Sequence, residues 1–416
     1  MVSIELVRRR YIIFLIVSFA FVLSFFHRMS LAAVASGLMA ERGLTPGQIG
    51  TLGSVYFYVY SLIQPPIGLI VDRWGVRRLL AGTMLIATAG GLIFAFGQSF
   101  GWLLFGRILI GLGYSAVFIS GVKLVTELFP PSDMALWVGL FQAVSSFGTI
   151  LAGRPLVEAS QWLGWSGGFL IAALFTALTA GAVWISLRGE RGRCPPAASR
   201  TARSDQLPLR SPLLYAFGMM MFMFVGVHIS FQSVWSGPYL ADVYRFRPAE
   251  VGNLLMLMPI GQIIGFAAVG WAADRLFRSR EITAILCSWL YTGLWILLAL
   301  APAGLSAGGI VALYLALGAL SSWFVLTVSL VRARLPGDNV GSAIGIVNLM
   351  AMLGGAVLQQ GFGALLNRFP ISHGAIPLAG YQTTFQVAAI VAVVGSLLLL
   401  AGIRIRPVTA ASKPAP

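Results

Sequence analysis

Long apolar runs alternate with short polar segments along the whole chain. A helix needs about 20 mostly apolar residues to cross a bilayer, and each run is close to that length or longer. The runs lack the period-two alternation of membrane strands, so each one predicts a spanning helix. The twelve runs lie at roughly 11–33, 47–71, 79–97, 101–122, 134–154, 165–187, 213–240, 249–273, 282–301, 306–331, 340–363 and 380–403.

A polar stretch rich in Arg, Pro and Ser interrupts the pattern near its middle. It divides the chain into a six-helix bundle at 1–187, a cytoplasmic linker at 188–212 and a second six-helix bundle at 213–416. Five residues of the first half recur in the second at a constant offset of 202 residues. They are Pro46, Gly50, Gly68, Asp72 and Arg73, repeated as Pro248, Gly252, Gly270, Asp274 and Arg275. Duplicated halves are typical of transporters that hold substrate near the midplane between the halves.

We therefore predict an all-α integral membrane protein with twelve transmembrane helices in two pseudo-symmetric halves. Composition agrees, because 58% of the residues are hydrophobic and only 10% are charged, against roughly 25% charged in a soluble domain. Cys194 lies in the polar linker and Cys287 in an apolar run, so neither a disulfide framework nor a metal site is predicted. No nucleotide loop or acid–nucleophile pair is visible, which predicts no cofactor and no enzyme.

The net charge is +15, and the basic residues are distributed over the loops as in a membrane protein. With a cytoplasmic N-terminus, 21 basic residues fall in cytoplasmic segments, 5 in outer segments and 2 inside helices. This bias predicts that both termini are cytoplasmic, and it leaves no basic surface for nucleic acid. The cluster Arg8–Arg10 precedes an apolar run too long for a signal peptide, so that run is the first span. We expect a monomer in a bacterial inner membrane, in contact with lipid.

The segment after the second run carries a dense set of charges and glycines. A carboxylate and several guanidiniums at a cytoplasmic helix junction can pair across a half and must separate when the halves rock. Charges that only set the topology are the alternative. The set comprises Gly68, Asp72, Arg73, Gly75, Arg77 and Arg78, with a degenerate second copy at Gly270, Asp274 and Arg275. It resembles the signature loop between helices 2 and 3 of the major facilitator superfamily.

Within that superfamily the first half of the chain is most similar to the organic-anion branch, the anion:cation symporters and organophosphate transporters. The resemblance rests on Phe26–Leu31 in helix 1, Arg107–Gly113 in helix 4, Lys123, Gly164–Trp165 and Asn348. It implies a secondary transporter of a small organic anion, energised by an ion gradient.

Arg28 is the strongest candidate for the substrate ligand. A charge at the centre of a spanning helix costs about 2.5–3.5 kcal/mol, so Arg28 should face a cavity or a partner. None of the acidic residues lies in the middle of a predicted span. A guanidinium without a protein counter-ion suits an anionic substrate, which it can hold through two hydrogen bonds. The alternative is that Arg28 extends to the outer surface.

Arg107 is the second arginine inside a span, near the outer start of helix 4. The resemblance implies that it supports helix packing or proton movement, and we group it with the conformational residues. Extension to the surface is equally compatible with its position.

Two departures from the branch concern coupling and charge. Positions that hold carboxylates in many anion symporters are His27 and Tyr114 here. An imidazole titrates near neutral pH, so His27 could carry a coupling proton, and His228 at a comparable depth in helix 7 is a second candidate. Hydrogen-bonded interior histidines are the alternative. Helix 7 also lacks the second arginine of organophosphate transporters, which favours a monoanion such as a carboxylate.

The remaining polar residues inside the spans are candidate cavity liners. Tyr56, Tyr60 and Gln64 follow at four-residue spacing and share one helix face. The others are Gln232, Trp235, Asn348 and Gln359. Rings and amides suit a small polar ligand, although for any single member an interhelical hydrogen bond is the simpler role.

Two other functions remain open. An exporter of cationic or apolar compounds would use a carboxylate inside the membrane to bind a cation. A transporter-like sensor would bind a ligand and signal to a partner through its surface.

Overall fold

The computed structural model describes residues 2–130, 132–188, 211–334, 340–372 and 374–405. Their regular structure is helical, apart from one isolated bridge between Ser372 and Ala375. Most of the predicted linker 188–212, including Cys194, lies outside the described residues.

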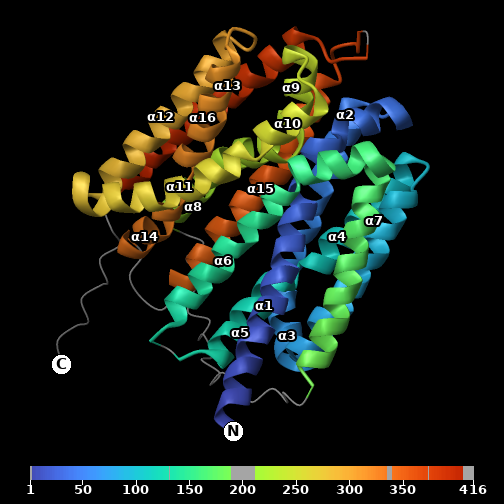
Figure 1. Cartoon of the computed structure of the whole chain (residues 1–416). Coiled ribbons are helices and arrows are strands. Elements are labelled where there is room, and N and C mark those ends of the chain that lie inside the picture. Colours follow the sequence, from blue (N-terminus) through green and yellow to red (C-terminus); the bar gives the residue numbers. More distant parts are fainter. Residues whose placement is uncertain (1, 131, 189–210, 335–339, 373, 406–416) are drawn as a thin grey trace, which may run out of the picture. The chain divides into compact units, whose positions relative to one another are not determined.

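The helices divide into two compact units (Figure 1). Unit 1 holds everything described before residue 189 together with Gln232–Met256. Its helices are α1 (Val2–Met29), α2 (Leu31–Arg42), α3 (Pro46–Phe96), α4 (Phe100–Tyr114), α5 (Val117–Leu128), α6 (Met134–Leu151), α7 (Arg154–Ser186), α9 (Ser236–Tyr244) and α10 (Pro248–Leu255).

Unit 2 holds the described residues from 211 to Phe231 and from Leu257 onward. Its helices are α8 (Pro212–Ser230), α11 (Leu257–Trp271), the π-helix η2 (Ala272–Leu276), α12 (Arg280–Leu300), α13 (Ala307–Ser321), α14 (Phe324–Arg334), α15 (Val340–Leu366) and α16 (Leu378–Arg404). A second π-helix, η1 (Phe231–Trp235), joins α8 to α9.

Every predicted apolar run falls on helix. Ten helical stretches of the described residues are long and apolar enough to span a membrane. Helix α3 covers two predicted runs, joined at Gly75, whose φ of 77° is left-handed and bends the chain. The apolar part of α6, Leu136–Leu151, is shorter than the ten. The protein is thus an all-helical membrane protein, and the number of twelve spans stays a prediction.

Serines lie at short interruptions in two spans that the sequence predicts as continuous helices. Helix α1 ends beside Ser30, whose hydroxyl donates to the His27 carbonyl at 3.2 Å. Helix α4 ends beside Ser115, whose hydroxyl donates to the Leu112 carbonyl at 2.6 Å. Such side-chain bonds compete with the helical ladder and bend helices. The backbone at Ser30 and Ser115 keeps α-region dihedral angles, so each interruption is short.

The two units use the same helix pairings. In unit 1, α1 packs on α6, and α3 packs on both α4 and α7. In unit 2, α8 packs on α15, α11 on α13 and α12 on α16. The helices in these pairs occupy corresponding positions in the repeat that the sequence predicts.

The compact units differ from the predicted halves in one segment. Helices α9 and α10 follow the linker in sequence, yet α9 packs against α2, and α10 packs against α7. The approach requires small residues, because a Cβ on Gly237 would lie 1.7 Å from the Ala32 carbonyl oxygen. Arg154 fixes the second contact by donating from Nη1 to Asn253 Oδ1 at 3.0 Å.

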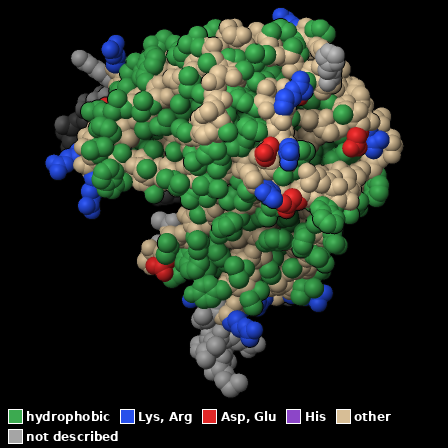
Figure 2. Space-filling model, turned by 45° about the horizontal axis from the view of Figure 1, so that its top comes forward, with side chains coloured by type: hydrophobic (Ala, Val, Ile, Leu, Met, Phe, Trp, Pro, Cys, Tyr) green, Lys and Arg blue, Asp and Glu red, His purple; other side chains and the backbone are tan. Residues whose placement is uncertain are grey.

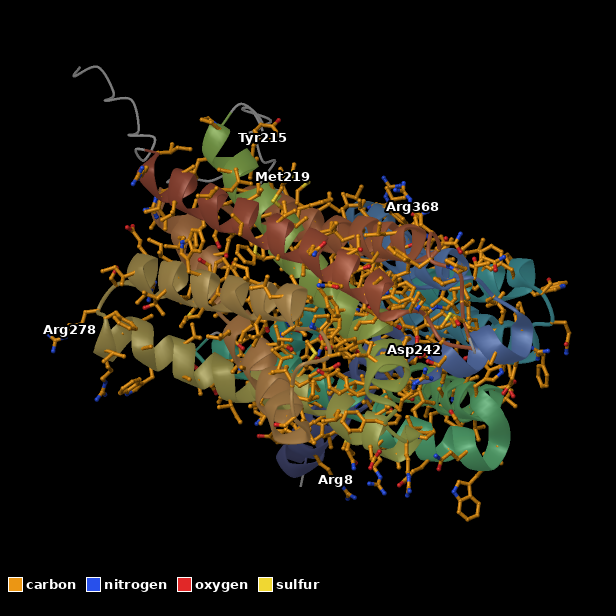
Figure 3. All side chains as sticks on the ribbon, turned by 90° about the horizontal axis from the view of Figure 1, so that it is seen from above. Arg8, Tyr215, Met219, Asp242, Arg278 and Arg368 are labelled. Carbon is orange, nitrogen blue, oxygen red and sulfur yellow. The ribbon has the colours of Figure 1, made fainter. Side chains whose placement is uncertain are left out.

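The outer surface is largely apolar, as a lipid-facing surface must be. Hydrophobic side chains cover most of the face in Figure 2, and the charged side chains gather in a few groups. Tyr215 and Met219 are exposed on α8, where Figure 3 labels them. Exposed leucines such as Leu62 and Leu69 on α3 continue the same surface. Water would disfavour so much exposed apolar area, whereas a bilayer accepts it.

Candidate functional site

Arg28 lies one residue before the end of α1 and is only 7% exposed. The alternative that it extends to the surface is therefore wrong. Four aromatic rings surround its guanidinium. The distances from Cζ to the ring centroids are 4.6 Å for Phe25, 4.8 Å for Tyr60, 5.8 Å for Tyr56 and 5.9 Å for Phe57. A desolvated cation gains about 2 kcal/mol or more from such contacts, so this ring box offsets part of the cost of burying the charge.

One edge of the Arg28 guanidinium has no described protein partner, although the group also interacts with the hydroxyls of Tyr56 and Tyr60. Its Nε and Nη2 atoms are buried and have no hydrogen-bond partner among the described residues. These two nitrogens present parallel N–H bonds, which match the two oxygens of a carboxylate. A buried donor without a partner costs about 1–3 kcal/mol, and more when it is charged. The Nε and Nη2 atoms of Arg28 thus keep hydrogen-bond donors that the described protein groups do not use.

The predicted liners on α3 already have protein partners. The Tyr56 hydroxyl shares a hydrogen bond of 3.2 Å with Ser24 Oγ, and its ring lies parallel to that of Tyr60. Gln64 donates from Nε2 to the Ser115 carbonyl at 3.4 Å. The common face predicted for these three residues holds, and Tyr56 and Tyr60 both reach Arg28.

Arg107 lies in the middle of α4 and is completely buried, so its extension to the surface is also wrong. It donates from Nη1 to the His27 carbonyl at 2.9 Å and from Nε to the Leu52 carbonyl at 3.0 Å. The His27 carbonyl belongs to the break after α1, next to Arg28. Leu52 lies one helical turn before Tyr56. One guanidinium thus ties together the two helices that build the ring box.

His27 is 1% exposed, and its Nδ1 has no hydrogen-bond partner among the described residues. Its ring faces the rings of Tyr114 at 5.2 Å and Phe169 at 5.8 Å. The Tyr114 hydroxyl shares a hydrogen bond of 2.7 Å with Thr176 Oγ1. The two positions that depart from the organic-anion branch are therefore neighbours inside unit 1.

The remaining predicted liners are divided between the units. In unit 2, His228 is 3% exposed and its Nδ1 lies 3.2 Å from the Tyr291 hydroxyl. Gln359 of α15 is buried, whereas Asn348 of the same helix is exposed. Gln232 and Trp235 are buried in η1 and belong to unit 1.

The signature loop of unit 1 pairs within that unit. Asp72 accepts a hydrogen bond of 2.6 Å from Lys123 Nζ, so its partner is an ammonium on α5 and not a guanidinium. Arg77 donates to the Trp184 carbonyl at 2.9 Å and stacks on that ring at 4.0 Å. Arg73 and Arg78 are exposed, and a Cβ on Gly68 would meet no described atom within 4 Å.

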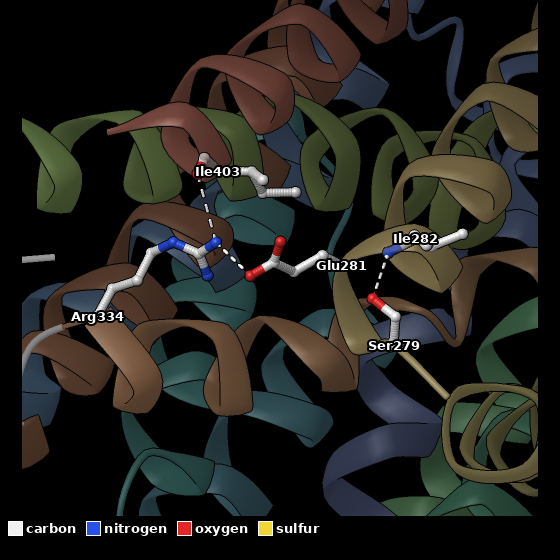
Figure 4. Close-up of polar contacts among 5 residues, drawn as sticks. All are labelled: Ser279, Glu281, Ile282, Arg334 and Ile403. Carbon is white, nitrogen blue, oxygen red and sulfur yellow. Dashed lines mark hydrogen bonds and ion pairs between the residues drawn. The ribbon is translucent and has the colours of Figure 1, made fainter. Parts of the chain in front are cut away.

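The second copy of this loop uses different residues. Asp274 and Arg280 are both exposed and 3.9 Å apart, and Arg275 is exposed beside them. The strong ion pair joins Arg334 at the end of α14 to Glu281 in the first turn of α12, and Arg334 also donates to the Ile403 carbonyl (Figure 4). A Cβ on Gly270 would meet no described atom within 4 Å.

Sequence reasoning missed several of these residues. Phe25 and Phe57 complete the ring box. Their closeness in sequence to Arg28 and Tyr56 is the feature from which they could have been predicted. Glu281 and Arg334 are 53 residues apart and fall outside the repeated motif, so no local pattern connects them.

Comparison with known proteins agrees with this architecture. The profile of the Major Facilitator Superfamily matches residues 17–359. The chain belongs to the Major Facilitator Superfamily. A solved superfamily-like fold, a bacterial homolog to the human lysosomal transporter Spinster, superposes with a TM-score of 0.77 at 17% identity over 95% of this chain and 97% of the other.

Two curated superfamily relatives carry transport names. The hexuronate transporter of Bacillus subtilis (strain 168) is 22% identical over 89% of this chain and 91% of its own length. The probable 4-methylmuconolactone transporter of Cupriavidus pinatubonensis is 26% identical over 62% of each chain. Family membership identifies a transporter and not an enzyme.

Proposed function

We propose that the protein is a secondary active transporter of a small organic anion, a carboxylate, and that it works by alternating access. The observation that carries the proposal is the buried edge of Arg28, where Nε and Nη2 have no hydrogen-bond partner among the described residues. A carboxylate supplies two acceptors and the missing charge at the same time. The ring box holds the guanidinium in place before the substrate arrives.

Two further observations support an anion. The relatives named for hexuronate and 4-methylmuconolactone transport organic acids. Among the described residues the buried charges are arginines, and no aspartate or glutamate is buried. An exporter of cations needs the opposite sign in its cavity, which makes that alternative the weaker one. A ligand sensor could use the same arginine but would not move substrate across a membrane.

The finer assignments complete the proposal. Transport is symport with a proton or another ion, and His27 and His228 are the candidate proton carriers. The loops around Asp72 and Asp274, with Arg107, change contacts during the cycle. The protein acts as a monomer in a bacterial inner membrane, with both termini in the cytoplasm, as the loop charges favour.

Thermal stabilisation of the purified protein by a panel of small ions tests this proposal. A ligand at about 100 times its dissociation constant adds roughly 2.7 kcal/mol to the stability, which a melting curve resolves. We expect carboxylates to raise the melting temperature of the wild type but not of Arg28→Ala. The control Arg278→Ala removes an exposed arginine of unit 2 (Figure 3) and should respond like the wild type.

Stabilisation by organic cations or apolar compounds that survives Arg28→Ala would contradict the proposal. Uptake into proteoliposomes separates transporter from sensor, because a sensor binds the same anion without accumulating it.

A further inference from the structure

The side chains around Arg28 also indicate which kind of carboxylate can bind to it. This inference rests on the proposed function and narrows its substrate. The guanidinium lies among Phe25, Tyr56, Phe57 and Tyr60, all with ring centroids within 5.9 Å of Cζ. A carboxylate bound at Nε and Nη2 would therefore lie near these four rings. Two of the rings, Phe25 and Phe57, carry no polar side-chain atom.

The polar groups near this edge are largely engaged already. The Tyr56 hydroxyl pairs with Ser24, and the Gln64 amide donates to the Ser115 carbonyl. The Tyr60 hydroxyl interacts with Arg28 itself and with Gln64. A sugar acid brings several hydroxyls, and each hydroxyl buried without a partner costs about 1–3 kcal/mol. Unit 1 thus favours a substrate with few hydroxyls close to the carboxylate.

We propose that the substrate is a monocarboxylate whose body beside the carboxylate is planar and aromatic. Rings at the spacing found here accept a flat apolar body by offset or edge-to-face contacts, which are worth about 0.5–1.5 kcal/mol beyond area burial. Arg28 binds the carboxylate, and the ring box selects against hydroxylated chains. Polyhydroxylated acids, among them hexuronates and aldonates, are poor ligands of this site.

Competition binding on the full-length wild-type protein tests this selectivity without any mutation. Benzoate and phenylacetate are compared with glucuronate and galactonate at neutral pH, where all four are ionised. Cyclohexanecarboxylate is the matched probe that keeps the size and charge of benzoate and removes its planarity. We expect benzoate or phenylacetate to bind at least about tenfold more tightly than either sugar acid, with cyclohexanecarboxylate between them.

Variants of Tyr60 connect the selectivity to the ring box. Tyr60→Phe keeps the ring, so we expect its affinity for the aromatic acid to stay within about threefold of the wild type. Tyr60→Leu removes the ring and should weaken the aromatic acid by about tenfold while changing the sugar acids little. Tyr215→Leu, at an exposed tyrosine of α8 in unit 2, is the control for loss of a tyrosine that is not part of the box.

Three results would overturn the inference. Sugar acids that bind as tightly as benzoate, with loss of binding in Arg28→Ala, would refute the aromatic selectivity and leave the anion transporter standing. Equal affinities of Tyr60→Leu and wild type for the aromatic acid would refute the role of the ring box. No binding of any carboxylate, or binding unchanged in Arg28→Ala, would refute the inference and the proposed function together.

Discussion

Three arginines are buried in the described parts of the chain, and the two units treat them differently. Arg28 and Arg107 in unit 1 form no ion pair with a described residue, and they contact rings and backbone carbonyls instead. Arg334 in unit 2 pairs with Glu281 and donates to the carbonyl of Ile403. When a buried arginine pairs with a protein carboxylate, its charge is already neutralised and it has no need of a ligand. When a buried arginine has no protein carboxylate beside it, its charge remains available to an anionic ligand.

The same contrast separates the buried centres of the two units. In unit 1 a free guanidinium edge lies among four rings, close to His27. In unit 2 the corresponding histidine, His228, lies against the Tyr291 hydroxyl, and none of the buried residues described on α8 is an arginine. The two units therefore differ in their buried charge, and the site proposed above takes its positive charge from unit 1.

The largest effect on stability should come from Arg107→Lys. Lysine keeps the charge but cannot bridge two carbonyls with a planar fork. Hydrogen bonds to a charged group are worth about 1.5–3 kcal/mol each, so we expect a destabilisation of about 2–3 kcal/mol. Because Arg107 holds the break beside Arg28, substrate affinity should fall at least about tenfold. Melting curves with and without the anion measure both effects.

The matched control is Arg278→Lys on the exposed loop of unit 2, which should change neither quantity. A destabilised Arg107→Lys protein with wild-type affinity would mean that Arg107 only packs helices. Unchanged stability would contradict the two carbonyl bonds.

Glu281→Gln should have the next largest effect, and only on stability. It leaves the charge of Arg334, whose side chain is 8% exposed, without its carboxylate. Loss of this charged bond should cost about 1–3 kcal/mol. Substrate affinity should stay within about threefold of the wild type, because the pair is complete without a ligand.

The double variant Glu281→Gln with Arg334→Met provides the control for this pair. Replacing both members by an uncharged pair is often nearly neutral, so much of the lost stability should return. A large loss of affinity in Glu281→Gln would show that the pair belongs to the binding site.

Removal of a single hydroxyl from each centre should have a smaller and equal effect. Tyr114→Phe breaks the bond to Thr176, and Tyr291→Phe breaks the bond to His228. Each should cost about 1 kcal/mol of stability and leave the rings in place. Chemical denaturation of both variants checks the equality. A loss of substrate affinity in Tyr114→Phe alone would add Tyr114 to the ligand contacts.

Asp72→Asn should have the smallest effect on stability. The Asp72–Lys123 pair is short, but the Asp72 side chain is 68% exposed. Exposed ion pairs contribute about 0.2–1 kcal/mol, and salt screens them. If the loop changes contacts during transport, the turnover rate should fall while the melting temperature stays nearly constant. An unchanged rate would leave Asp72 with a topological role alone.

The all-helical membrane fold could be predicted from the sequence because a lipid environment allows few other structures. Runs of about 20 apolar residues have few structural alternatives in a bilayer, and Arg28 was identifiable because a charge inside a run is costly. The partners of Arg107 were not predictable, since they are backbone carbonyls that every sequence possesses. The interruptions at Ser30 and Ser115 depend on local hydroxyl bonds that compete with the helix by small free energies. The Glu281–Arg334 pair depends on tertiary packing.

Uptake of the best-binding carboxylate into proteoliposomes, with wild type and Arg28→Lys compared, is the decisive test of Arg28 as the substrate ligand. Lysine retains the positive charge and loses the two parallel N–H bonds of Arg28. We predict that the apparent affinity for uptake falls at least about 30-fold in Arg28→Lys, and that the control Arg368→Lys, at an exposed arginine outside the Asp274 loop, behaves as the wild type. Uptake by Arg28→Lys with wild-type affinity would contradict the assignment of Arg28 as the ligand of the substrate carboxylate.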